Sequence, residues 1–134
     1  MSIGFLRIRK ARPEDLIQRT VFQHIKHRGV PGLVALHVPN GGYRKPIEAA
    51  KLKGLGVQKG APDVLLWHRP SPLEPGRSYA VELKSPDGRL SEAQAEMLAR
   101  LEKAGVFTAV AHGLDQALAV LESWHLLRGR GRFA

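Results

Sequence analysis

Two acidic residues and one lysine at the ends of two apolar segments have the types and spacing of a site that hydrolyses a phosphate ester. Asp63 comes directly before the apolar residues 64–67, and Glu82-Leu83-Lys84 closes the next apolar run. If the two runs are adjacent antiparallel strands, Asp63 and Glu82 lie side by side at one end of a sheet. Glu82 and Lys84 are two positions apart, so their side chains project from the same face of their strand.

Two carboxylates can hold a hard divalent cation through their oxygens, and a nearby ammonium can position or deprotonate an attacking water. Without a cation or a proton between them, two close carboxylates repel each other. These residues therefore predict a metal-dependent phosphodiesterase site. Spacing alone leaves a second interpretation equally open, in which Glu82 and Lys84 are an ordinary pair at a strand end and Asp63 is a turn residue.

The composition favours a nucleic acid as the partner. The chain has 134 residues, the size of one domain, with 21 Lys and Arg against 12 Asp and Glu, a formal net charge of +9. A small basic protein is drawn to polyanions, of which nucleic acid is the usual one. A generic basic surface, such as that of a ribosome-associated protein, is the alternative. Cysteine is absent, which excludes disulfide bonds, thiolate zinc sites and a cysteine nucleophile.

The chain divides into a basic arm at residues 1–12, a single domain at residues 13–127, and a basic tail at residues 128–134. The apolar run in the arm is too short and too broken for a signal peptide. The tail alternates arginine and glycine, which predicts a flexible segment. No window approaches ~18 consecutive apolar residues, so we predict no membrane span and a cytoplasmic protein.

Apolar periodicity and turn residues predict alternating helices and strands. The predicted helices cover residues 13–28, 46–53, 91–104 and 114–124, and the predicted strands cover residues 33–38, 64–67, 79–83 and 106–111. The second of these helices is short. The strands at residues 64–67 and 79–83 are too continuously apolar for a sheet that is wet on one face. We therefore expect an α/β fold with a mixed sheet flanked by helices.

An ordered set of short motifs accompanies these elements. Pro62-Asp63 and Glu82-Leu83-Lys84 are joined by Glu14 and Gln18 in the first helix, Asn40, Lys59-Gly60-Ala61, Leu90-Ser91 with Gln94, and Gly105-Val106. In this order they resemble the VRR-NUC (virus-type replication–repair nuclease) family of the PD-(D/E)XK nuclease superfamily, over about residues 14–111. A second Pro-Asp pair, Pro86-Asp87, lies in a predicted turn outside this pattern.

The resemblance implies a restriction-endonuclease-like core with the element order αβββαβα and a nuclease domain at residues 13–127. It implies that Asp63, Glu82 and the backbone carbonyl of Leu83 bind Mg²⁺ or Mn²⁺ and that Lys84 orients or activates the water. No nucleotide cofactor is expected, because the glycine-rich residues 54–60 lack the Lys-Ser/Thr that follows a phosphate-cradling loop.

The resemblance also implies a DNA endonuclease that acts in DNA repair, recombination or phage replication. Compact members of the family tend to be homodimers, often viral or prophage-encoded, and some cut branched DNA such as four-way junctions. The expected setting is the cytoplasm of a bacterial or phage-infected cell, at the nucleoid. A flap- or sequence-specific nuclease of the same fold and a DNA-binding module without cleavage remain alternatives.

Two polar residues lie on the apolar side of the first predicted helix. At ~100° per residue, Glu14 and Gln18 fall within the same arc as the apolar residues of this helix. Polar groups in an inward stripe are costly without a partner. The resemblance implies that the acid, Glu14, completes the metal or water shell and that Gln18 accompanies it in the site; Gln18 is the stronger candidate of the two. Glu14 could instead be a solvated acid that interacts with the helix dipole. Asp15, at the edge of the arc, is the weaker candidate.

Further residues are candidates for contacts with DNA. Gln94 lies on the apolar side of its helix and is either the capping-box partner of Ser91 or a contact to the active site or to DNA. Asn40 is followed by two glycines and is equally a turn residue or a phosphate contact. A basic stretch leads into Asp63 and could either contact phosphates or form a solvated face; it consists of Arg44, Lys45, Lys51, Lys53 and Lys59.

Overall fold

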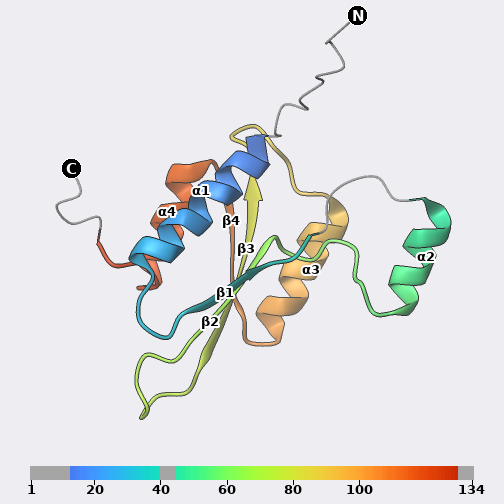
Figure 1. The fold of residues 1–134 in the computed structure, drawn as a ribbon. Helices are drawn as coiled ribbons and strands as arrows, with labels where there is room; N and C mark the ends of the chain where they lie inside the picture. Colours follow the sequence, from blue (N-terminus) through green and yellow to red (C-terminus); the bar gives the residue numbers. More distant parts are fainter. Residues whose placement is uncertain (1–12, 40–44, 130–134) are drawn as a thin grey trace, which may run out of the picture.

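The computed structural model describes residues 13–39 and 45–129 (Figure 1). Within them the chain forms α1 (Pro13–Arg28), β1 (Val34–His37), α2 (Pro46–Gly54), β2 (Val64–His68), β3 (Arg77–Lys84), α3 (Glu92–Lys103), β4 (Phe107–His112) and α4 (Leu114–Ser123). The predicted basic arm at residues 1–12 lies outside the described residues. None of the described helices is long and apolar enough to cross a membrane.

The strands form one mixed sheet in the order β1-β2-β3-β4. β2 runs antiparallel to β1 and to β3, whereas β4 runs parallel to β3. A parallel pair needs a crossover connection, and α3 provides it between β3 and β4. The predicted α/β fold class and the order of its elements are therefore confirmed. β3 begins at Arg77, before the predicted start at Tyr79, because its pairing with β2 extends as far as His68.

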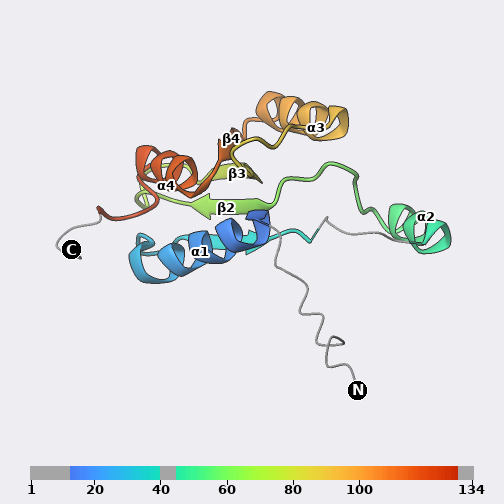
Figure 2. The ribbon, with the colours of Figure 1, turned by 90° about the horizontal axis from the view of Figure 1, so that it is seen from above.

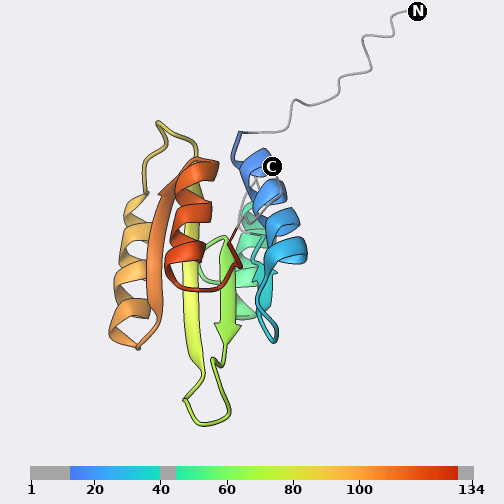
Figure 3. The ribbon, with the colours of Figure 1, turned by 90° about the vertical axis from the view of Figure 1, so that its left-hand side faces the viewer.

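α1 and α4 cover one face of the sheet and lie side by side (Figure 3). Side chains alternate between the two faces along a strand, so Leu66 of β2 and Val81 of β3 point to this side. They pack in one apolar cluster with Val21 of α1 and Leu118 of α4, all of them at most 2% exposed. Burying side chains of this size stabilises a fold by about 1.5–3 kcal/mol each. This cluster is the core of the protein.

α3 packs against the opposite face, near β3 and β4 (Figure 2). Its N-terminus carries the predicted capping box, in which the side chains of Ser91 and Gln94 each accept a hydrogen bond from the backbone N–H of the other. Leu98 anchors the helix by its burial. Glu82 and Lys84 point to the same face as α3, since they alternate with Val81 along β3.

α2 stands apart from the sheet and the other helices (Figures 1 and 2). Pro46 at its first turn suits a helix N-terminus, where its missing N–H has no intrahelical partner in any case. None of the residues of α2 is buried. The helix therefore adds no side chain to the core, and it borders an open space toward α3.

A buried arginine joins the end of α1 to the end of the described chain. The guanidinium of Arg28 donates hydrogen bonds to the carbonyl of Arg128 at 3.0 and 2.8 Å, and it also contacts Glu122 and His24. The backbone N–H of Arg128 donates in return to the carbonyl of Arg28 at 2.7 Å. Arg128, the first residue of the predicted tail, is thus bonded to the body of the domain. Residues 130–134 lie outside the described part of the chain.

Candidate active site

The two strands bring the acidic residues and the lysine together as their spacing predicts. Val64 pairs with Val81, which places Asp63, directly before β2, next to Glu82. The Asp63 carboxylate accepts a hydrogen bond from the backbone N–H of Leu83 at 2.8 Å. The Nζ of Lys84 lies 3.9 Å from the Glu82 Oε2. Asp63, Glu82 and Lys84 therefore share one end of the sheet.

The backbone carbonyl of Leu83 is directed to the Asp63 side of β3. In a strand, the N–H and the C=O of one residue point toward the same neighbouring strand. Because the N–H of Leu83 meets the Asp63 carboxylate, its carbonyl points toward β2 as well. The next carbonyl, that of Lys84, accepts instead from Gly113 on the β4 side. The predicted third oxygen ligand is thus on the correct side of the strand.

Glu82 is a buried carboxylate with one oxygen atom that has no partner. Its side chain is 2% exposed, and among the described residues its Oε1 has no hydrogen-bond partner. Burial, then a hydrogen bond with the Asp63 side chain and the charge of Asp63, raise the pKa of Glu82 from 4.5 to about 9. The charge of Glu14 adds to this rise, and that of Lys84 opposes it. Without a cation, the Asp63–Glu82 pair therefore holds a proton at neutral pH.

These groups suit a hard divalent cation. A cation between Asp63 and Glu82 would replace the shared proton and give the Glu82 Oε1 a partner. No group of three Asp, Glu, His or Cys residues that could hold a metal exists in the described part of the chain. The available ligands are two carboxylates and the carbonyl of Leu83. This set matches Mg²⁺, which usually binds one or two carboxylates and keeps several waters.

Asp63, Glu82 and Lys84 line a cavity of about 370 Å³, which we call the site cavity. Glu14 and Gln18 of α1 line it too, as their inward position on the predicted helix indicates, and both are partly buried. Asp15, the weaker candidate, also reaches this cavity. Lys59 lines it from the loop before β2. With His37 of β1 and Gln94 of α3, which also line it, the cavity brings together residues from five segments of the chain.

Gln94 fills both of the roles that the sequence left open. Its Oε1 accepts from the backbone N–H of Ser91 at 2.9 Å, which closes the capping box. Its Nε2 donates to the Glu82 Oε2 at 3.3 Å. Capping therefore fixes the Gln94 side chain in a position from which it holds the buried carboxylate. Oε1 of Glu82 is left for another ligand.

Gly60 allows the loop before β2 to pack directly on α3. Its φ of +82° is in the left-handed region, which favours glycine. A Cβ at this position would lie 2.5 Å from backbone atoms of Ala93 and 2.9 Å from the backbone nitrogen of Gln94. Only glycine permits this approach, which sets the distance between Asp63 and the first turn of α3.

His37 is a site residue that the sequence did not indicate. It ends β1 opposite Val64, its ring Nδ1 lies 2.8 Å from the backbone oxygen of Asp63, and it lines the site cavity. Its position depends on the pairing of β1 with β2. A single histidine in a short strand carries no signal of that pairing.

Apart from Gln94, the predicted DNA-binding residues fall into three groups. Lys59 lines the site cavity, and Lys59 and Lys53 line a second cavity between α2 and α3. Lys45 is the N-cap of α2 and Lys51 lies in its last turn, both exposed. Asn40 and Arg44 lie outside the described residues.

The mixed sheet, with two carboxylates and a lysine at one strand end, defines a nuclease-type α/β domain. The VRR-NUC domain family model matches residues 12–115, most of the chain. The chain therefore belongs to the VRR-NUC family, a nuclease-type family, as its motifs predicted.

Three solved chains match this protein, among them two VRR-NUC structures. The first, a "VRR_NUC domain protein", is 26% identical, with a TM-score of 0.68 over 87% of this chain and 92% of the other. The second, a "VRR_NUC domain", is 20% identical, with a TM-score of 0.56 over 85% of this chain and 99% of the other, and it supports the fold alone. No curated protein matches the chain significantly.

Proposed function

We propose that the protein is a DNA endonuclease that uses Mg²⁺ or Mn²⁺ to hydrolyse phosphodiester bonds. The observation that carries this proposal is the buried Glu82 carboxylate, which lies against the Asp63 carboxylate and beside Lys84 in the site cavity, and whose Oε1 accepts no hydrogen bond from a donor among the described residues. A purely structural carboxylate in this position would be expected to have both oxygens hydrogen bonded. The net charge of +9 supports an anionic substrate.

A bound divalent cation would polarise the phosphate, lower the pKa of the attacking water and offset the charge that develops on the phosphate oxygens. Asp63, Glu82 and the Leu83 carbonyl would hold it. Gln94 keeps the Glu82 carboxylate in place through Oε2. Lys84, with Nζ near the same carboxylate, donates a hydrogen bond to the water and directs its lone pair to the phosphorus. The new P–O bond forms as the bond to the leaving oxygen breaks; the attacking water gives a proton to the solvent, and the leaving oxygen takes a proton from the solvent.

The family membership supports a structure-specific activity on branched DNA, such as four-way junctions, in repair, recombination or phage replication. A homodimer suits this activity, because one small domain presents one site and paired incisions need two. The other candidates within the same fold are a flap-specific and a sequence-specific nuclease.

The test is a cleavage assay with labelled four-way junction, flap, single-stranded and duplex DNA in Mg²⁺, Mn²⁺ or EDTA. We expect cutting of at least one DNA with metal and none in EDTA. Asp63→Asn and Lys84→Ala should each lower the rate by about 100-fold or more. Asp87→Asn, in the second Pro-Asp pair, is the matched control and should cut like the wild type.

Cutting that persists in EDTA, or in the Asp63→Asn and Lys84→Ala proteins, would contradict the metal mechanism. Binding of all four DNAs without any cutting would favour a DNA-binding module. The intact set of Asp63, Glu82 and Lys84 argues against that outcome, since a binding module has no need of a buried carboxylate with an unpartnered oxygen.

A further inference from the structure

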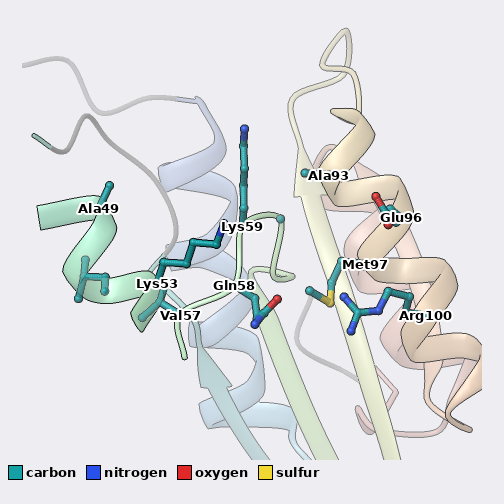
Figure 4. A pocket seen from close by; sticks show the side chains of 11 residues that line it. Ala49, Lys53, Val57, Gln58, Lys59, Ala93, Glu96, Met97 and Arg100 are labelled. Atoms are coloured by element: carbon teal, nitrogen blue, oxygen red, sulfur yellow. The ribbon is translucent and has the colours of Figure 1, made fainter. Parts of the chain in front are cut away.

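A second cavity, the α2–α3 cleft, opens beside the site cavity (Figure 4). It has a volume of about 630 Å³. Lys53 and Val57 line it from α2 and the loop that follows, and Met97 and Arg100 line it from α3. Lys59 and Gly60 line both cavities, so the cleft continues directly into the candidate active site.

The charges in the α2–α3 cleft suit an anionic ligand. Lys53, Lys59 and Arg100 are exposed; Lys53 and Arg100 extend into the space between α2 and α3, and Lys59 stands on the loop between them (Figure 4). None of the three forms an ion pair with a carboxylate among residues 13–39 and 45–129. Glu96 is the acidic residue that lines the cleft. Three cations against one anion give the cleft a net positive charge, which favours phosphate groups.

The cleft also has an apolar surface. Met97 is partly buried on α3, and Val57 faces the cleft from the loop after α2. A methionine is polarizable and unbranched, so it adapts to the flat face of an aromatic ring. A site that combines cations for the backbone with an apolar platform for bases is typical of single-stranded nucleic acid binding.

The volume of the cleft suits a single strand better than a duplex. Cavities of about 300–1,000 Å³ take a ligand the size of one or two nucleotides. Duplex DNA is far wider, since its major groove alone measures about 12 Å across. No residue of α2 is buried, so this helix borders the cleft without closing it. A strand can therefore run through the cleft to the active site.

We propose that the α2–α3 cleft binds the unpaired DNA strand that leads to the scissile phosphate. Phosphates contact Lys53, Lys59 and Arg100, and a base packs against Met97 and Val57. This inference rests on the proposed nuclease function and narrows its substrate to DNA with a single-stranded segment beside the cut.

The first experiment measures binding in EDTA, where no cutting is expected, with a labelled 15-nucleotide oligo-dT and a blunt 15-base-pair duplex. Arg100→Ala should weaken oligo-dT binding about tenfold and reduce its salt slope by about 0.7, the share of one phosphate contact on a single strand. Duplex binding should change less than twofold. Lys26→Ala removes a charge that is also exposed, on α1, and it should change oligo-dT binding less than twofold. An unchanged affinity for oligo-dT in Arg100→Ala, or an equal loss for both DNAs, would overturn the proposal.

The second experiment uses the absence of cysteine from the sequence. Met97→Cys gives one thiol in the cleft, and Ala119→Cys gives one on the exposed side of α4 as a control. An oligo-dT that carries an activated mixed disulfide on a base should exchange with the thiol of Met97→Cys, releasing its leaving thiol, at least tenfold faster than with that of Ala119→Cys. Equal rates would contradict the proposal. So would a disulfide-linked dimer of Met97→Cys that oligo-dT does not suppress, because the cleft would then hold a second copy of the chain.

The two proposals can fail separately. If the wild type cuts no DNA but binds oligo-dT through Arg100, the nuclease function fails and the strand site stands. If Arg100→Ala cuts flap DNA and the four-way junction as fast as the wild type and binds oligo-dT equally, the cleft proposal fails and the nuclease function stands.

Discussion

Replacing Glu82 by glutamine should stabilise the metal-free protein at neutral pH. Burial, followed by the hydrogen bond with Asp63 and the charges of Asp63 and Glu14, raises the pKa of Glu82 from 4.5 to about 9 in the folded protein, and Lys84 opposes the rise. At low pH, both the folded and the unfolded states hold the proton. Above pH 4.5 the unfolded state loses it first, so the free energy of unfolding falls by about 1.4 kcal/mol per pH unit. At pH 7 the free energy of unfolding of the wild type is therefore about 3 kcal/mol lower than at low pH. Glu82→Gln has no titrating group at this position, so its free energy of unfolding should not fall in this way.

The assay is urea unfolding, followed by tryptophan fluorescence, at pH 5, 6, 7 and 8 in EDTA. The free energy of unfolding of Glu82→Gln minus that of the wild type should increase with pH. In Mg²⁺ at about 100 times its dissociation constant, the wild type should gain about 2.7 kcal/mol and Glu82→Gln much less. Glu96→Gln, at an exposed position on α3, should match the wild type under all conditions.

A difference between Glu82→Gln and the wild type that does not change between pH 5 and 8 would refute the reasoning, because it would mean that the buried carboxylate does not hold an extra proton. A gain in stability from Mg²⁺ that is equal in both proteins would show that the cation binds elsewhere.

Three further substitutions test the contacts around the site and the core. Gly60→Ala should lower the free energy of unfolding by about 2 kcal/mol or more, because a left-handed φ costs about 1–2 kcal/mol and the new Cβ would clash with α3. Gly54→Ala is the control: no atom lies within 4 Å of the new Cβ, so it should raise the free energy of unfolding by about 0.4–1 kcal/mol. Equal effects of Gly60→Ala and Gly54→Ala in urea unfolding would contradict the close approach of Gly60 to α3. Arg28→Met, which breaks the buried ion pair with Glu122, should lower the free energy of unfolding by about 3 kcal/mol. Arg77→Ala, which breaks an exposed ion pair with Glu74, should lower it by less than about 1 kcal/mol. Similar losses in the two variants would show that the Arg28–Glu122 pair contributes little. Gln94→Ala should weaken Mg²⁺ binding about 10-fold or more, as measured by calorimetry, and an unchanged affinity would show that its hydrogen bond to the buried carboxylate is incidental.

Local sequence patterns were sufficient to predict the elements of this fold. The apolar runs around residues 64–67 and 79–83 became the paired β2 and β3, and the capping box at Ser91 began α3. These signals lie within a few residues of one another along the chain, where spacing and turn chemistry are informative. The same holds for Asp63, Glu82 and Lys84, because a hairpin pairing and the two-residue repeat of a strand are enough to bring them together.

Local sequence patterns did not predict the contacts between segments that are far apart along the chain. His37 reaches the site because β1 pairs with β2, and Arg100 borders the cleft because α2 stands away from α3. Gly60 shows the physical reason. Its sequence context predicts only a flexible loop, yet its role is set by backbone atoms of Ala93, more than thirty residues later, that leave no room for a Cβ. The same contact places Gln94 within reach of Glu82, so the geometry of the acidic pair depends on a packing constraint that no local motif contains.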